Sequence, residues 1–231
     1  MHIAVLVTNT DRSKFASRHP GDGAKFAAMI GAVRPDWRVT AFDLTAGERP
    51  KELERVDGVI IGGSPASVNG HEPWIADLEP LIRAVVGRGQ KLFGACFGHQ
   101  AIARALGGMV ADNPRGWVLG VTDTRIDRAA PWIAAGPIRM NAAHSEQVLT
   151  LPPGAEVLGG NAECPVGFYR IGRTVFATQY HPEMTDDFMA ALVAEFAPKM
   201  ASGVAATARG SLAAPADTAR FVEMIARFFE G

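Results

Sequence analysis

The segment KLFGACFGHQ, residues 91–100, places a cysteine where a strand is expected to turn into a helix. Cys96 lies between Gly94 and Gly98, after an apolar run and before the helical run Ala101–Leu106. This is the cysteine form of the nucleophile elbow, a sharp turn that holds the nucleophile in a strained backbone conformation. The flanking glycines let backbone and substrate approach closely. The pattern predicts covalent catalysis by a thiolate.

A cysteine in this position also gains from the helix that follows it. Unpaired N–H groups at a helix N-terminus favour the thiolate over the thiol. The backbone N–H of Phe97 is therefore a candidate donor of an oxyanion hole. The alternative is that Cys96 is a small buried residue at the end of a core strand, as many free cysteines are. Cys164, in the sequence AECP, has no such elbow and is expected to be a bystander.

A candidate base for this nucleophile occurs in the sequence HPE, after the strand expected at 174–179. Pro182 favours an extended conformation for His181, which presents the imidazole at the carboxyl end of the strand. Residues two apart in an extended chain point the same way, so Glu183 can bond the far ring nitrogen. Cysteine, histidine and carboxylate would then act as nucleophile, base and orienting group. The alternative is a surface turn with incidental polar residues.

A glycine turn follows the strand expected at Val56–Ile61, in the sequence IIGGSPAS. Such a turn exposes backbone N–H groups at the carboxyl edge of a sheet. Gly63 is thus a candidate for the second oxyanion donor, although two glycines after a strand also occur in plain turns. The chain contains neither GxxxxGK[ST] nor GxGxxG, so no phosphate loop is predicted.

The remaining histidines offer weaker candidates. His99 falls within the elbow helix and is expected to be structural. A metal site built from His71, Glu72, His181 and Asp186 stays open as an alternative, but no HExxH or comparable spacing supports it. We therefore predict no metal and no organic cofactor.

The elements that must position these residues alternate between strand and helix. Continuous apolar runs are typical of strands buried on both faces of a parallel sheet. The pattern predicts an α/β fold with an open, mostly parallel, twisted sheet and flanking helices, of the doubly wound kind. The expected strands are Ile3–Val7, Trp37–Leu44, Val56–Ile61 and Lys91–Ala95, and the expected helices are Ala24–Val33 and Trp74–Val86.

The second half of the chain has a different pattern of predicted elements. From Gly107 to Phe176, short strand-like pieces separated by glycine, proline and asparagine predict small β embellishments. Helices are expected at Asp186–Lys199 and Asp217–Phe229, and the Ala/Gly/Ser-rich stretch Ala201–Pro215 is expected to be a mobile loop, as a linker rather than a lid. We expect a single domain over residues 1–231, with a C-terminal helical extension at about 200–231.

Composition and charge exclude several classes of binding partner and indicate the compartment. The 231 residues include 23 Lys and Arg against 24 Asp and Glu, a net charge of −1, which gives no electrostatic reason to expect nucleic acid or a membrane surface. The two cysteines form no CxxC pair, which fits a reducing compartment. No apolar run approaches the ~20 residues that span a bilayer, and the run Met1–Val7 is too short for a signal sequence. A cytoplasmic location is expected.

Together, three segments resemble the class I glutamine amidotransferase family: the Gly62-Gly63 turn, GACFGHQ at 94–100 and HPE at 181–183. The likeness is to stand-alone chains related to the glutaminase domain of GMP synthase, and it runs from about residue 1 to about residue 190. The phrases WIADL at 74–78 and NPRGW at 113–117 also resemble these members. The resemblance implies a largely parallel sheet flanked by helices, in agreement with the pattern above.

The resemblance also implies roles for individual residues. The triad carries over to Cys96, His181 and Glu183, and the oxyanion donors to the backbone N–H groups of Gly63 and Phe97. Two departures affect neighbouring positions: Ser64 separates Gly63 from Pro65, and Ala143 stands where asparagine or serine is usual. The implied substrate pocket comprises Gly62, Gln100, Ser145 and Glu146.

Three functions follow as hypotheses. The first is hydrolysis of the glutamine side-chain amide through a cysteinyl γ-glutamyl thioester, which releases glutamate and ammonia. Only about 48 residues follow Glu183, too few for a synthetase domain, so the ammonia would serve a separate synthetase subunit. The second is γ-glutamyl peptidase or transferase activity on peptides or γ-glutamyl amines. The third is a catalytically silent binding or regulatory module.

Overall fold

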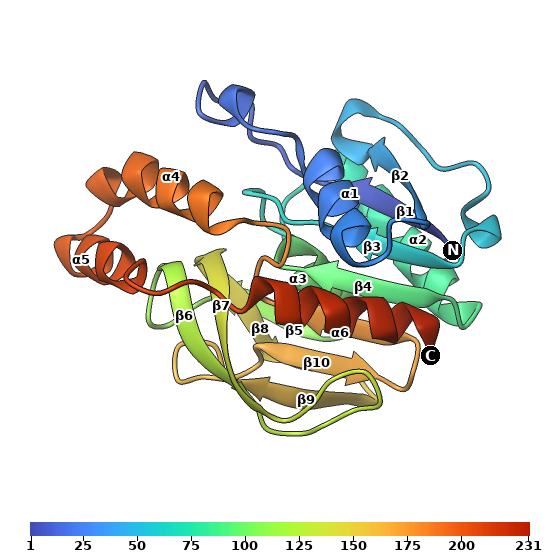
Figure 1. Ribbon diagram of the computed structural model, residues 1–231. Coiled ribbons are helices and arrows are strands. Elements are labelled where there is room, and N and C mark those ends of the chain that lie inside the picture. Colours follow the sequence, from blue (N-terminus) through green and yellow to red (C-terminus); the bar gives the residue numbers. More distant parts are fainter.

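The computed structural model describes residues 1–231 and has a nine-stranded sheet with helices on both faces (Figure 1). The strand order is β2-β1-β3-β4-β11-β10-β9-β6-β7. The strands from β2 to β11 pair in parallel, which confirms the expected α/β sheet. These parallel strands are β1 (His2–Val7), β2 (Arg38–Asp43), β3 (Gly58–Ile61), β4 (Lys91–Ala95) and β11 (Val175–Thr178).

The second half of the chain extends this sheet with antiparallel strands. The short β pieces expected here therefore do more than decorate the fold, and a strand that was not expected, Gly136–His144, joins them. Four strands of this half continue the main sheet and two form a small separate sheet. The continuing strands are β6 (Val118–Ile126), β7 (Gly136–His144), β9 (Ala155–Gly160) and β10 (Phe168–Ile171), and the separate pair is β5 (Met109–Asp112) with β8 (Glu146–Thr150).

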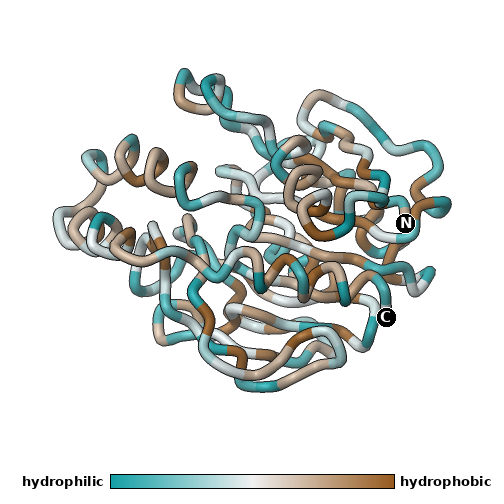
Figure 2. The backbone as a smooth tube through the Cα atoms, viewed as in Figure 1, coloured by the Kyte–Doolittle hydropathy of each residue, from teal (hydrophilic) through white to brown (hydrophobic).

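Two apolar clusters cover the two faces of the sheet. On one face, α1 (Asp22–Val33) and α6 (Thr218–Glu230) pack on the sheet, and on the other face lie α2 (Pro73–Gly87) and α3 (Phe97–Ala105). Hydrophobic residues follow the central strands and alternate with hydrophilic ones along α6 (Figure 2). Because both faces are covered, every residue from Ile3 to Leu6 is fully buried. No helix has the length and apolar character needed to cross a membrane.

The parallel pairing brings the chemically interesting segments to one edge of the sheet. In the register, Ile61 of β3 lies opposite Gly94 of β4, and Ala95 lies opposite Thr178 of β11. All three strands run in the same direction, so the segments that follow them leave the sheet at its carboxyl edge. The glycine turn, Cys96 and the segment before His181 therefore emerge side by side.

The stretch Ala201–Pro215 is not the loop expected from its composition. Residues Ser202–Ser211 form α5, which packs with α4 (Asp186–Phe196) against β6. Alanine has the highest helix propensity, and Ala205 and Ala208 are buried against β6. The side chain of Ser211 accepts a 2.9 Å bond from the N–H of Val121 and so joins the helix end to the sheet. The stretch has few large hydrophobic residues, so its sequence did not indicate that it packs as a helix.

The segment between β1 and α1, residues 9–20, forms an N-terminal arm that reaches toward α4 (Figure 1). The arm contains one short 3-10 helix, Ala16–Arg18. The ring of Phe15 lies 5.8 Å from that of Phe188 and 5.9 Å from that of Phe196, measured between centroids. The arm therefore contacts a helix more than 160 residues away in sequence, which no local pattern predicts.

Two buried histidines make the fold sensitive to acid. His99 is completely buried beside Tyr169, and burial, helped by the charge of His144, lowers the pKa of His99 to about 3. Burial likewise lowers the pKa of His144 to about 4. In the unfolded chain both take up protons below pH ~6.5, so the unfolded state binds more protons and stability decreases as pH falls from there toward these values.

We expect His99→Leu to reduce the loss of unfolding free energy between pH 7 and pH 4, because the variant removes one of these neutral groups. Urea unfolding at several pH values measures the slope, which is ~1.4 kcal/mol per pH unit for one proton. The exposed His71 provides the matched control His71→Gln, which should keep the parental slope. An unchanged slope in His99→Leu would contradict the assignment.

Candidate active site

Cys96 occupies the sharp turn between β4 and α3, as the sequence predicts. Its backbone angles are φ 50° and ψ −106°, and no other residue except glycine has a positive φ. Such a conformation costs about 1–3 kcal/mol and is concentrated at functional sites. The N–H of Cys96 donates a 2.9 Å bond to the carbonyl of Thr178, which fixes the turn against the end of β11. The structure therefore holds this cysteine in place at an energetic cost.

The flanking glycines make the turn possible. A Cβ atom on Gly94 would lie 2.7 Å from the carbonyl of Gly98, and one on Gly98 would collide with the carbonyl of Ile61. The N–H of Gly98 donates a 3.0 Å bond to the carbonyl of Gly62. Absence of side chains at these positions thus lets α3 begin directly against the end of β3.

Two backbone N–H groups next to Cys96 are the candidates for an oxyanion hole. Phe97 is the first residue of α3, where an N–H has no partner inside the helix. Gly63 lies so close that a Cβ atom on it would be 2.9 Å from Cε1 of His181 and 3.7 Å from Cβ of Cys96. Its N–H has no hydrogen-bond acceptor in the protein. Ser64, the departure from the usual turn, accepts a 3.1 Å bond from Ala66 through its hydroxyl and stiffens the loop.

Gly62, expected in the substrate pocket, has a supporting position instead. Its N–H donates to the carbonyl of Leu6 at 3.2 Å, and its carbonyl accepts bonds from Gly98 and from the hydroxyl of Thr8. Gly62 does not line the cavity in front of Cys96. Because its polar groups are already bonded within the protein, Gly62 braces the turn and has no group left for a substrate.

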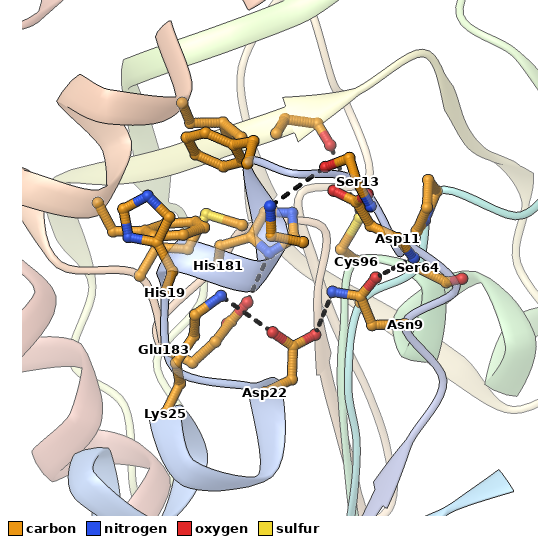
Figure 3. Close-up of a pocket in the computed structure, with 18 of the residues that line it drawn as sticks. Asn9, Asp11, Ser13, His19, Asp22, Lys25, Ser64, Cys96, His181 and Glu183 are labelled. Atoms are coloured by element: carbon orange, nitrogen blue, oxygen red, sulfur yellow. Dashed lines mark hydrogen bonds and ion pairs between the residues drawn. The ribbon is translucent and has the colours of Figure 1, made fainter. Parts of the chain in front are cut away.

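His181 and Glu183 form a buried pair beside Cys96 (Figure 3). Nδ1 of His181 lies 2.7 Å from Oε1 of Glu183, and both side chains are almost completely buried. The N–H of His181 donates to the carbonyl of Asn141 at 2.9 Å, and the side-chain amide of Asn141 donates to the carbonyl of Met184 at 2.8 Å. Strand β7 thereby fixes the HPE segment at both ends. With Nδ1 occupied, Nε2 is the ring nitrogen left to serve Cys96.

Electrostatics favour a proton on this imidazole. Burial of His181 opposes protonation, but the negative charges of Cys96 and Glu183 and their hydrogen bonds outweigh it and raise the pKa of His181 well above the usual range. His144, also buried, has no carboxylate beside it, and its pKa moves in the opposite direction. The contrast indicates that the carboxylate and the thiolate, and not the degree of burial, decide the charge of His181.

Gln179 contacts the candidate nucleophile, although the sequence analysis did not single it out. Its Nε2 lies 3.7 Å from Sγ of Cys96, and its Oε1 accepts a 3.2 Å bond from Nε2 of Gln100. Nε2 of Gln100 also donates to the carbonyl of Glu146 at 2.8 Å, which fixes the orientation of both amides. Gln179 is completely buried at the end of β11. Its burial marks it as part of the site, but burial cannot be seen in the sequence.

The predicted pocket residues Gln100, Ser145 and Glu146 line one cavity together with Cys96. Oε1 of Glu146 accepts a 2.7 Å bond from the hydroxyl of Ser67, which orients the carboxylate. The backbone of Glu146 is held by Gln100 and by the imidazole of His144, whose Nδ1 lies 3.1 Å from its carbonyl. Both N–H groups of the Gln100 amide are used, so only its Oε1 is free to accept a bond from a ligand.

The cavity has a volume of about 510 Å³ and extends well beyond the residues expected from the sequence. It includes Asn9 of the N-terminal arm and Asp22 and Lys25 of α1. The Asp22 carboxylate accepts a 2.9 Å bond from the side-chain amide of Asn9 and a 3.0 Å bond from Nζ of Lys25 (Figure 3). The cavity also includes apolar side chains of α4. These residues were missed because they come from segments remote in sequence with no motif of their own.

Cys164 and the open metal alternative lie outside this arrangement. Cys164 does not line the cavity, and burial raises the pKa of its thiol to about 12. His71, Glu72 and Asp186 are also absent from the cavity lining. Nowhere do three or more His, Cys, Asp or Glu side chains converge in a group that could hold a metal ion. The groups that converge are a thiol, an imidazole–carboxylate pair and free backbone N–H groups, which is the equipment for acyl transfer.

Comparison with known proteins agrees with this geometry. The family model for glutamine amidotransferase class-I matches residues 28–196. Over 195 residues the chain is 31% identical to γ-glutamyl peptidase 4 of Arabidopsis thaliana, covering 80% of this chain and 77% of that protein. Over 134 residues it is 31% identical to a glutamine-hydrolyzing GMP synthase of Aeropyrum pernix, covering 57% of this chain and 25% of that protein.

A solved structure shares the fold. The crystal structure of a glutamine amidotransferase from Methylobacillus flagellatus superposes with a TM-score of 0.78 at 19% sequence identity, covering 99% of this chain and 93% of that one. The resemblance seen in the sequence is thus confirmed by the family model and by the fold. This chain belongs to the class I glutamine amidotransferase family.

Proposed function

We propose that the protein is a cysteine-dependent amidohydrolase that cleaves the γ-amide bond of glutamine through a Cys96–His181–Glu183 triad. The observation that carries the proposal is the convergence on one cavity of a cysteine in a strained elbow, the buried His181–Glu183 pair and Gly63, whose N–H is free. A silent binding module has no physical need for this set of groups. The membership of the family supports the same general chemistry.

In the first half of the reaction, the Cys96 thiolate attacks the carboxamide carbon and forms the S–C bond. The N–H groups of Gly63 and Phe97 stabilise the negative charge that develops on the carbonyl oxygen, and loss of one such donor typically reduces the rate by ~10²–10³. The C–N bond then breaks while Nε2 of His181 gives its proton to the departing nitrogen. The products are ammonia and a γ-glutamyl thioester.

In the second half, His181 accepts a proton from water as the water oxygen attacks the thioester carbon. The S–C bond breaks, glutamate leaves and the Cys96 thiolate is restored. Glu183 holds the imidazole through Nδ1 in both halves, so Nε2 faces the reacting atoms throughout. We place the α-amino and α-carboxylate groups of the substrate near Ser145 and Glu146. The free Oε1 of Gln100 and the oriented Glu146 carboxylate suit an ammonium group.

The released ammonia is proposed to serve a separate synthetase subunit. The similarity to a GMP synthase covers only 25% of that protein, so the remainder of the synthetase has no counterpart in this chain.

A second candidate function is hydrolysis or transfer of γ-glutamyl groups from peptides or amines, favoured by the size of the cavity. Pockets of roughly 300–1,000 Å³ hold ligands much larger than the ten non-hydrogen atoms of glutamine, and this one measures about 510 Å³. The chemistry at Cys96 is the same in both cases, and only the leaving amine differs.

Cys96→Ala should abolish release of ammonia from glutamine, because no other thiol reaches the site. A coupled glutamate assay measures the rate, and a thiol-directed glutamine analogue, followed by mass spectrometry, measures labelling of Cys96. The matched control Cys164→Ala removes the other cysteine and should retain both properties. Release of ammonia at the parental rate by Cys96→Ala would contradict the proposal, and folded parental protein that resists labelling would favour the silent module.

Glu183→Gln should move the basic limb of the pH–rate profile to lower pH. His181 must carry a proton to protonate the leaving nitrogen, so activity decreases as pH rises through the pKa of His181. The Glu183 carboxylate raises that pKa, and its neutral replacement removes this contribution. We also expect kcat to fall, because the amide holds the imidazole less firmly. A basic limb at the parental pH would contradict this role for Glu183.

Comparison of glutamine with γ-glutamyl-glycine separates the two candidate functions. If the cavity serves γ-glutamyl peptides, kcat/KM for the dipeptide should exceed that for glutamine by about tenfold or more, since binding of the extra residue contributes only to the peptide. The measurement is release of glutamate from each substrate, with and without candidate partner proteins. A clear preference for glutamine would support the amidotransferase function.

A further inference from the structure

The helix that follows the triad carries an apolar stripe facing the cavity. Met184, Phe188, Leu192, Phe196 and Met200 occur at every fourth position, and all of them line the cavity; we call them the apolar wall. Phe188, Leu192 and Phe196 lie on α4, whereas Met184 precedes this helix and Met200 follows the short 3-10 helix after it. Residues four apart lie on the same face of a helix. The adjacent positions Met189, Val193 and Ala197 are fully buried in the cluster that joins α4 to β6 and α5. Met184, Leu192, Phe196 and Met200 also pack against this cluster, so one side of the apolar wall is used in the fold and the other side borders the cavity.

The N-terminal arm adds aromatic surface from the opposite side. The rings of His19 and Phe188 are 5.0 Å apart, and Nζ of Lys25 lies 3.7 Å from the centre of the Phe188 ring. Phe15 and His19 line the same cavity as the apolar wall. Trp117, whose side chain is 49% exposed, also borders it. An exposed tryptophan beside an aromatic wall is a surface suited to an apolar ligand.

Most charged groups at this end already have side-chain partners, and the carboxylate of Asp11 accepts a bond from the N–H of Ser13. Asp22 binds Lys25 at 3.0 Å and Asn9 at 2.9 Å, and Arg12 donates to the hydroxyl of Thr45 at 2.7 Å. A ligand here therefore meets mostly apolar and aromatic side chains. Recognition by charge is left to the other end of the cavity, where Glu146 lies.

The chemistry of the triad determines which part of a substrate reaches this surface. His181 protonates the departing nitrogen, so the leaving group must lie on the side of His181. The apolar wall begins at Met184, directly after Glu183. The γ-glutamyl group, in contrast, points toward Gln100 and Glu146. The two ends of the substrate are thus separated by Cys96.

We infer that the part of the cavity lined by the N-terminal arm and the apolar wall is a leaving-group subsite, and that it selects γ-glutamyl compounds whose amine portion is apolar and aromatic. This inference rests on the proposed cleavage of γ-glutamyl bonds at Cys96. It adds the substrate class: the amine carries a phenyl or similar group that packs on Phe188.

The test compares γ-glutamyl-phenylalanine with γ-glutamyl-glycine on the full chain. We expect kcat/KM for the phenylalanine peptide to be at least about tenfold higher, mainly through KM, because the phenyl group leaves water for the apolar wall. Phe188→Ala should bring the ratio of the two values toward one, and the conservative Phe188→Leu should restore part of it. Phe42→Ala, a matched substitution on β2 outside the cavity, should keep the parental ratio.

A second measurement needs no variant. Phenethylamine should inhibit hydrolysis of γ-glutamyl-glycine at least about tenfold more strongly than ethylamine, because only the aromatic amine fills the subsite. Equal kcat/KM values for the two peptides, or a ratio that Phe188→Ala leaves unchanged, would overturn the subsite even if glutamine is hydrolysed. Failure of the parental protein to hydrolyse any substrate or to be labelled at Cys96 would instead overturn the proposed function itself.

Discussion

The parallel pairing of β3, β4 and β11 is the constraint on which the site depends. Each strand delivers one part to the same edge: the glycine turn, the strained cysteine and the segment that leads to His181. The strands are so close that side chains must be absent where the loops meet, at Gly63 beside His181 and at Gly98 beside Ile61. The geometry of the candidate site is thus a consequence of strand order, and the local turns complete it.

The parts of the site encoded by short motifs could be predicted from the sequence. The elbow around Cys96 and the extended HPE segment depend on neighbouring residues, and the structure contains both. Gln179 and the N-terminal arm could not be found in this way, because their contacts join residues far apart in the chain. The composition of Ala201–Pro215 led to a wrong prediction of a loop. Small residues there form a helix, and Ala205 and Ala208 are buried.

The same buried region holds imidazoles in opposite charge states. His99 and His144 are kept neutral because burial penalises the charged form and no carboxylate compensates. His181 is equally buried, but Glu183 and Cys96 supply two negative groups that favour its proton. A low dielectric strengthens both effects. The neighbouring Glu183 and Cys96 therefore separate an imidazole that holds a proton from two that stay neutral.

Helix α6 has a consequence for the order in which the molecule forms during synthesis. It supplies Phe221, Ile225 and Phe228 to the core on one face of the sheet. Its Glu223 is tied to Arg34, at the end of α1, by a 3.0 Å ion pair. Until the ribosome has made this helix, the finished strands expose an apolar face to solvent or to chaperones. The edge that carries the candidate site is complete once Glu183 has been made, but one face of its sheet is covered only when α6 arrives.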